Sequence, residues 1–97
     1  MRESSLQKQI IQYLRSQGDY VFKAVGSSMQ QRGTADLLVC HQGLFIALEV
    51  KAPDGKESML QQVERRKVMQ AGGIAEVIYE LDEVYPVLKL AERIKWS

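Results

Sequence analysis

The sequence predicts an α/β domain in which helices cover both faces of a mixed four-stranded sheet, with the elements in the order αβββαβα. Four short apolar runs bounded by turn residues predict strands, and three segments whose apolar residues recur at helical spacing predict helices. The two central runs are apolar on both faces, so each side of the sheet needs a cover. A chain of 97 residues fits one compact domain, spanning residues 1–97.

The first third of the chain predicts a helix, a strand and a polar loop. Apolar residues at helical spacing predict a helix over residues 3–17: Leu6, Ile10, Tyr13 and Leu14. Gly18 follows at the position where a helix commonly ends in a left-handed residue. Tyr20 to Val25 has the aromatic and β-branched content of a strand. The loop at residues 26–33 is long enough to be functional.

The middle of the chain predicts a β-hairpin. Ala35 to Cys40 and Leu44 to Val50 are apolar runs joined by His41-Gln42-Gly43, a turn in which Gly43 supplies a positive φ. We expect His41, at the tip, to face solvent as part of the turn and not to serve as a ligand. Cys40 is expected to be a small core hydrophobe.

The last part predicts a helix, a strand and a helix. A helix begins after Ser58, which can cap it, and ends at Gly72-Gly73. Its predicted buried side consists of Leu60, Val63, Val68 and Ala71. A strand from Ile74 to Tyr79 follows. Asp82 can then cap a final helix, which tolerates Pro86 in its first turn, with an apolar side formed by Val84, Val87, Leu88, Leu90, Ala91 and Ile94.

The composition limits which classes of protein and of site the chain can contain. The sequence has no apolar run of about 18 residues and no signal-like N-terminus, so we expect a soluble, cytoplasmic protein with no membrane contact. One cysteine excludes an internal disulfide and a multi-cysteine zinc site. The net charge of +1 neither indicates nor excludes nucleic acid, because a divalent cation can carry part of a phosphate contact. No aromatic-rich platform for base stacking is apparent.

Two charges of opposite sign, Glu49 and Lys51, lie in the most hydrophobic predicted strand. Their spacing puts both side chains on one face. If Gln42-Gly43 is a two-residue loop, the numbers of paired residues sum to 85 and Asp36 lies opposite Glu49. Directly opposite side chains have Cβ atoms roughly 5 Å apart, a distance at which two carboxylates repel unless a cation lies between them.

The loop length decides this arrangement. A four-residue loop keeps the same register, whereas a three-residue loop without a bulge would set Asp36 against Leu48 and separate the two acids. In the even register, two carboxylates and a lysine meet in an otherwise apolar wall, and carboxylate oxygens suit hard divalent cations such as Mg²⁺ or Mn²⁺. The alternative is a buried ion pair between Lys51 and one acid, which leaves the second acid unexplained.

With these motifs the chain resembles the PD-(D/E)xK nuclease superfamily and, within it, the virus-type replication-repair nuclease (VRR-NUC) domains. The matching segments are Glu3-Ser4-Ser5-Leu6-Gln7, Gly33-Thr34-Ala35-Asp36, Glu49-Val50-Lys51 and Leu60-Gln61. The similarity covers nearly the whole chain and implies a restriction-endonuclease-like core. Ala35 departs from the pattern, since the family usually has proline there.

The resemblance implies a metal-dependent DNA endonuclease. It assigns Asp36, Glu49 and the main-chain carbonyl of Val50 to the metal and Lys51 to the attacking water. It completes the site with Gln61 and Glu3, the latter as a possible further ligand; Gln7, one turn further along the helix, is the alternative to Glu3.

The resemblance also implies partners. Stand-alone members are homodimers of bacterial or phage replication and repair, in the cytoplasm of a bacterium or phage-infected host, and act on branched DNA such as Holliday junctions. Arg32, Lys8 and Lys56 are candidates for contacting the DNA backbone, with Arg32 favoured because it directly precedes the motif. The loop at 26–32 and the final helix ending in Trp96 are candidate dimer surfaces. The alternative function is a non-catalytic module that binds nucleic acid or protein and contains a buried polar network.

Overall fold

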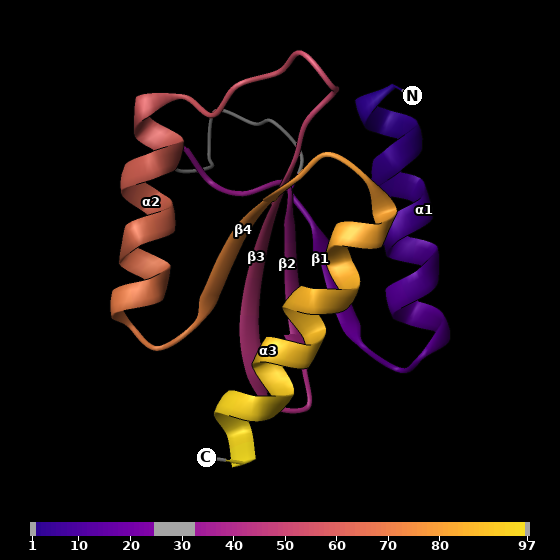
Figure 1. Ribbon diagram of the computed structural model, residues 1–97, viewed down its shortest axis with the longest axis vertical. Coiled ribbons are helices and arrows are strands. Elements are labelled where there is room, and N and C mark those ends of the chain that lie inside the picture. Colours follow the sequence, from indigo (N-terminus) through magenta and orange to yellow (C-terminus); the bar gives the residue numbers. More distant parts are fainter. Residues whose placement is uncertain (1, 25–32, 97) are drawn as a thin grey trace.

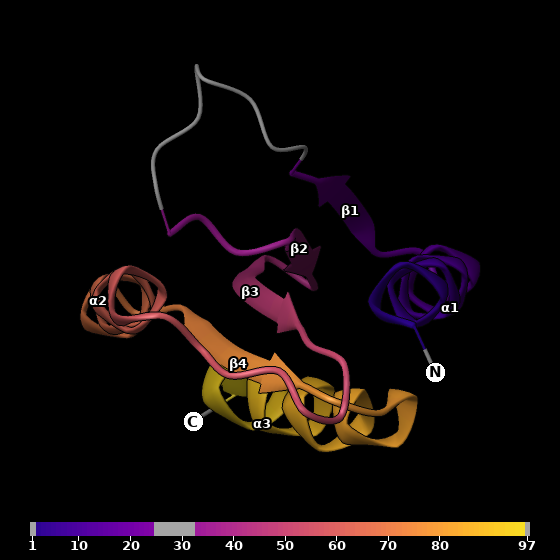
Figure 2. The same ribbon diagram turned by 90° about the horizontal axis from the view of Figure 1, so that it is seen from above.

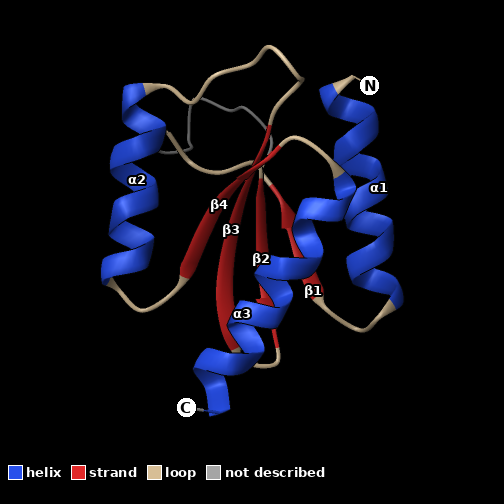
Figure 3. Cartoon of the chain, in the orientation of Figure 1, coloured by secondary structure: helices blue, strands red, loops and turns tan. Residues whose placement is uncertain are grey.

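The computed structural model describes residues 2–24 and 33–96. The predicted order of elements is confirmed, with ends shifted by a few residues (Figures 1 and 3). The elements are α1 (Glu3–Ser16), β1 (Tyr20–Lys23), β2 (Leu37–His41), β3 (Leu44–Val50), α2 (Met59–Gln70), β4 (Ile74–Ile78), the short 3₁₀ helix η1 (Leu81–Glu83) and α3 (Val84–Trp96).

The four strands form one mixed sheet in the order β1-β2-β3-β4, in which only the β3–β4 pair is parallel. The β2–β3 hairpin turns at Gln42 and Gly43, whose φ values of 51° and 87° match the two-residue turn that suits twisted strands. His41 pairs with Leu44, and Leu37 pairs with Leu48. The predicted register, with residue numbers that sum to 85, is therefore confirmed.

Helices lie on both faces of the sheet (Figure 2). On one face, α1 and α3 cover the main core; its fully buried members include Ile10, Leu14, Leu37, Ile46, Leu48, Val50, Ile78 and Val84. On the other face, α2 lies over a small alanine cluster formed by Ala35, Ala47 and Ala75. Because side chains alternate along a strand, the neighbours of these core residues on β3, including Glu49, point toward the α2 face.

The predicted buried side of α2 is wrong. None of the residues of α2 is buried, and Leu60 and Val63 are exposed. Val68 packs against the alanine cluster, and the other half-buried residues of α2 include Gln61 and Arg65. The face of α2 that meets the sheet is thus largely polar.

The start of α3 also differs from the prediction, in which Asp82 was the cap. A 3₁₀ turn precedes α3, and Oε1 of Glu83 accepts the backbone N–H groups of Tyr79 and Glu80 at 2.6 and 3.1 Å. Along α3, Val84, Val87, Leu88 and Ala91 are buried as predicted, whereas Leu90 and Ile94 are exposed. Within the described part of the chain, no helix has the length and apolar character needed to cross a membrane.

Candidate functional site

Asp36 is held against the C-terminal end of β3. Its Oδ2 accepts the backbone N–H of Val50 at 2.7 Å, and its main-chain oxygen accepts the N–H of Ala24 at 2.8 Å. Continuing the hairpin register by one residue beyond the Leu37–Leu48 pair places Asp36 opposite Glu49. The register therefore brings Asp36 to the level of Glu49 at one end of the hairpin, and a shared face for the two side chains stays a prediction.

Glu49 is the most deeply buried acid of the site, with 2% of its surface exposed. Burial and a hydrogen bond to the carboxylate of Glu57 raise its pKa from an ordinary 4.5 to about 8, against the opposing charges of Lys51 and Arg65. Among the described residues, its Oε2 atom has no hydrogen-bond partner. A buried carboxylate oxygen without a partner is costly, so this position favours a proton or a cation.

The partner of Glu49 is itself anchored by Arg65 on α2. The Nε and Nη2 atoms of Arg65 donate to the two oxygens of Glu57 at 2.8 and 3.0 Å, a forked arrangement. The bonds to Arg65 hold the pKa of Glu57 below its usual value. Glu57 therefore keeps its charge and Glu49 takes the proton that the two acids share.

Sequence reasoning missed the pair of Glu57 and Arg65. A signal was present. Arg65 follows Gln61 by one helical turn and therefore shares its face of α2. Glu57 lies in the turn-rich loop before α2 and carried no comparable signal.

Lys51 and Gln61 are in direct contact. The Nζ atom of Lys51 donates to Oε1 of Gln61 at 3.0 Å, and the backbone N–H of Ser58 donates to the same oxygen at 2.9 Å. Ser58 returns a bond by accepting the N–H of Gln61 at 3.1 Å, which completes a capping box at the start of α2. The predicted cap thus also fixes the side chain that meets the lysine.

A pocket of about 200 Å³ lies between α2 and the sheet beside Glu49. Its walls are mainly apolar and come from the segment 33–35, β2, β3, β4 and α2, and its charged lining residues beside Glu49 are Glu64 and Arg65. The sequence predicted an apolar wall around the acids, with Cys40 as part of the core. Instead Cys40 is exposed and 43% of the surface of Phe45 is exposed, because α2 stands over the β3–β4 half of the sheet.

The other predicted residues lie further from this centre. The N-terminal end of α1, which begins with the half-buried Glu3, lies at the same end of the sheet as the C-terminal end of β3 (Figure 1). Gln7 is buried on α1, whereas Lys8 and Lys56 are exposed. Arg32 lies outside the described residues.

The donor set fits a hard divalent cation. In residues 2–24 and 33–96, no three His, Cys, Asp or Glu side chains are grouped so as to hold a metal ion, so Glu3 does not complete such a group. The predicted set of Asp36, Glu49 and the Val50 carbonyl contains two carboxylates and does not need a third. The unpartnered Oε2 of Glu49 and the all-oxygen character of the set are what such an ion requires.

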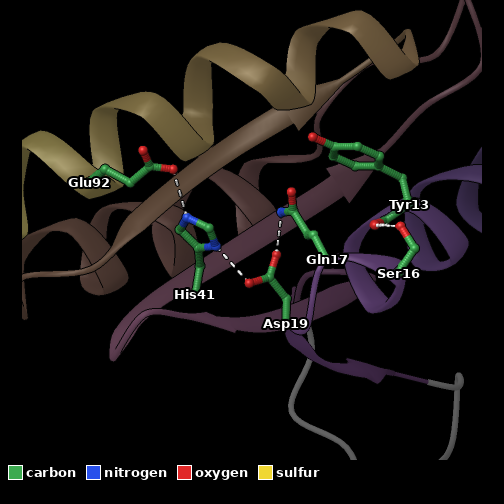
Figure 4. A network of polar contacts seen from close by, with 6 residues as sticks. All are labelled: Tyr13, Ser16, Gln17, Asp19, His41 and Glu92. Carbon is green, nitrogen blue, oxygen red and sulfur yellow. Dashed lines mark hydrogen bonds and ion pairs between the residues drawn. The ribbon is translucent and has the colours of Figure 1, made fainter.

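His41 is not the solvent-facing turn residue that the sequence predicted. It is 5% exposed, and its ring lies between two carboxylates (Figure 4): Nδ1 is 2.6 Å from Asp19 and Nε2 is 3.0 Å from Glu92. Burial lowers the pKa of His41, but the bonds to both acids outweigh it and the net pKa is raised. Its two nitrogens point apart, so this network joins α3 to the α1–β1 turn and does not form a metal site.

Comparison with solved structures identifies the fold. No family model and no curated protein matches the chain. A structure described as a VRR_NUC domain is 24% identical with a TM-score of 0.73, covering 90% of this chain and 94% of that one. A second, described as a VRR_NUC domain protein, is 16% identical with a TM-score of 0.74, covering 97% and 90%. The chain therefore has the fold of a VRR-NUC nuclease domain, as the sequence resemblance implied.

Proposed function

We propose that the protein is a divalent-metal-dependent DNA endonuclease that hydrolyses phosphodiester bonds in branched DNA, Holliday junctions in particular, and that it acts as a homodimer. The observation that carries the proposal is Glu49, a buried acid on β3 with one oxygen that has no hydrogen-bond partner among the described residues. Val50, whose N–H donates to Asp36, ends the same strand, and Lys51 follows it directly. The nuclease fold of the solved relatives supports the same reaction class.

Asp36, Glu49 and the main-chain carbonyl of Val50 would hold Mg²⁺ or Mn²⁺. When bound, such an ion lowers the pKa of water and neutralises charge on a phosphate. Asp36 is already oriented for this role by the Val50 N–H, which its Oδ2 accepts. Glu49 carries a proton near neutral pH because its pKa is about 8, so binding of a cation would release that proton.

Lys51 is the group that meets the substrate in this proposal. One of its three N–H donors is directed at Gln61, so the remaining donors can hydrogen-bond the attacking water or a nonbridging phosphate oxygen. Gln61 is a positioning residue: its oxygen is held by the Ser58 N–H and in turn fixes the lysine. Glu3, at the same end of the molecule, is proposed as a further site residue, and Arg32, Lys8 and Lys56 as contacts to the DNA backbone.

A cleavage panel tests the proposal. Linear, flap and four-way DNA substrates are incubated with Mg²⁺, Mn²⁺ or a chelator. We expect cleavage of the four-way substrate with either ion and none with chelator. Asp36→Ala and Glu49→Ala should abolish cleavage and weaken Mn²⁺ binding measured by calorimetry. Lys51→Ala should abolish cleavage but keep Mn²⁺ binding, and Gln61→Ala should have a milder effect.

Asp82→Ala, which removes an exposed acid, is the matched control and should cleave normally. Wild-type cleavage by Asp36→Ala would refute the assignment of the site. A wild-type protein that neither binds Mn²⁺ nor cleaves any substrate would favour the non-catalytic module, in which Glu49, Glu57 and Arg65 form a buried polar network.

A further inference from the structure

The half of the sheet that α2 does not cover presents an apolar surface. We call this surface the open sheet face and define it by Tyr20, Phe22, Leu38, Cys40 and Phe45. The three aromatic side chains are 68%, 47% and 43% exposed, in chain order. The sequence had indicated no such grouping, because the aromatic residues come from β1 and β3, which are separated in the sheet by β2.

The strand register places these side chains next to one another. Tyr20 pairs with Cys40, which pairs with Phe45, so the three form one row across the sheet. Phe22 pairs with Leu38 in the next row on the same face. Tyr20, Phe22, Leu38, Cys40 and Phe45 line one continuous groove of about 300 Å³.

The open sheet face continues into the candidate site. Leu38 and Phe45 line both the groove and the pocket that contains Glu49. The largest apolar patch on the surface of a protein is often functional, and one that adjoins a candidate site indicates an interaction surface.

We propose that the open sheet face is where a second copy of this chain docks. The proposal deepens the homodimer of the proposed function and replaces the two surfaces that the sequence offered. The chemistry of the face favours a protein over a nucleic acid, because none of its five side chains is charged and binding of DNA depends on cations that neutralise phosphates.

The shape of the described residues also suits a second copy. Among the described elements, only α2 stands on this face, and the half of the sheet beside it is bare of them (Figure 2), which makes a step about one helix diameter high, ~10 Å. Two sheets pack face to face at a similar spacing, roughly 10 Å. Two copies related by a twofold axis could therefore place bare half against bare half, with α2 of each beside the edge strand β1 of the other.

The area is sufficient for the centre of such an interface. An aromatic side chain has on the order of 200 Å² to bury, so three that are about half exposed contribute roughly 300 Å² per copy. A standard interface takes about 800 Å² from each partner, with an apolar centre and a more polar rim. The open sheet face matches the centre, and the adjoining residues of α2 and β1 lie where the rim would be.

Oligomeric state tests the proposal directly. The molar mass of the full chain is measured by light scattering and sedimentation equilibrium, without DNA or metal. We expect a dimer for the wild type. Phe22→Asp and Tyr20→Asp should each raise the dimer dissociation constant about 30-fold or more, as expected for loss of an aromatic anchor. Trp96→Asp is the matched control: it removes an aromatic that is 77% exposed at the end of α3 and should leave the dimer intact.

The reactivity of Cys40 provides a second measurement, because it is the only cysteine and lies within the central row. Its alkylation by a maleimide should slow as the wild-type concentration rises through the dissociation constant, and should stay fast in Phe22→Asp at every concentration. Circular dichroism of each variant verifies that the fold is kept.

Three results would overturn the proposal. A monomeric wild type, or a dimer lost in Trp96→Asp and kept in Phe22→Asp, would exclude this face as the dimer interface. Protection of Cys40 in a monomer would assign the face to another segment of the same chain, and protection only when an oligonucleotide is added would assign it to nucleic acid. Because these measurements need no cleavage, an inactive dimer would refute the proposed nuclease alone, and an active monomer would refute the interface alone.

Discussion

Replacing Glu49 with glutamine should stabilise the metal-free protein at pH 8. The folded state raises the pKa of this carboxyl from 4.5 to about 8, so between these values the unfolded chain loses a proton that the folded chain keeps. Folding stability falls over that range as the pH rises. Glutamine has no such proton to lose, and its amide N–H can replace the carboxyl O–H that Glu49 directs at Glu57.

The size of the effect follows from the pKa difference. Treated alone, a carboxyl whose pKa changes from 4.5 to about 8 on folding costs roughly 4 kcal/mol at pH 8. Glu57 shares the proton and the site can relax, so we expect about half of this, ~2 kcal/mol. For a domain of this size that corresponds to an increase in Tm of about 10 °C. At pH 4, where the carboxyl is protonated in both states, the gain should be small.

Thermal and urea denaturation followed by circular dichroism, with chelator present, measure the effect at pH 4, 6 and 8. The matched control is Asp54→Asn, which neutralises an exposed acid in the neighbouring loop and should change little. Added Mn²⁺ should raise the Tm of the wild type and not that of Glu49→Gln, because a ligand that binds only the folded state stabilises it. An unchanged or lower stability of Glu49→Gln at pH 8, or an equal gain at every pH, would refute the reasoning.

Other perturbations follow from the same structure. His41→Gln should lower stability by about 1–2 kcal/mol at pH 6 and by less at pH 9, because folding raises the pKa of the imidazole and its charged bonds are lost as the pH rises through that value; equal losses in denaturation at both pH values would contradict this. Arg65→Gln should destabilise by about 1–2 kcal/mol at pH 8, and by less as the pH falls through the lowered pKa of its partner Glu57, as urea denaturation would reveal. Gly33→Ala should cost about 2–4 kcal/mol and slow cleavage, because its Cβ would lie 2.6 Å from the Leu60 carbonyl oxygen; Gly18→Ala, with a similar positive φ but open space, should cost only about 1 kcal/mol.

The sequence was sufficient for the parts of the fold that depend on local rules. The turn at Gln42-Gly43 needs two residues with positive φ, and that requirement alone set the register that brings Asp36 to the level of Glu49. The cap at Ser58 is equally local, and it located the start of α2 and, with it, Gln61.

What the sequence could not reveal depends on partners that are distant along the chain. The sequence predicted a turn residue at His41, because Asp19 and Glu92, which contact its two ring nitrogens in the folded chain, are 22 and 51 residues away in sequence. The helical stripe of α2 predicted a buried apolar side, but of its residues only Val68 packs against the alanines of the sheet, and Leu60 and Val63 are exposed. The pattern alone does not report which part of a helix face the sheet beneath it reaches.

The two faces of the sheet serve different purposes. The face under α1 and α3 contains the fully buried core, and of these residues the proposed metal site uses only the main chain of Val50. The face under α2 carries an acid that favours a proton or cation, a helix without a buried residue and an uncovered row of aromatics. Because the first face supplies most of the apolar burial, the second can hold groups that cost stability until a cation, a substrate or a second copy meets them. Substitutions on the α2 face should therefore change binding more than folding, and those on the core face the reverse.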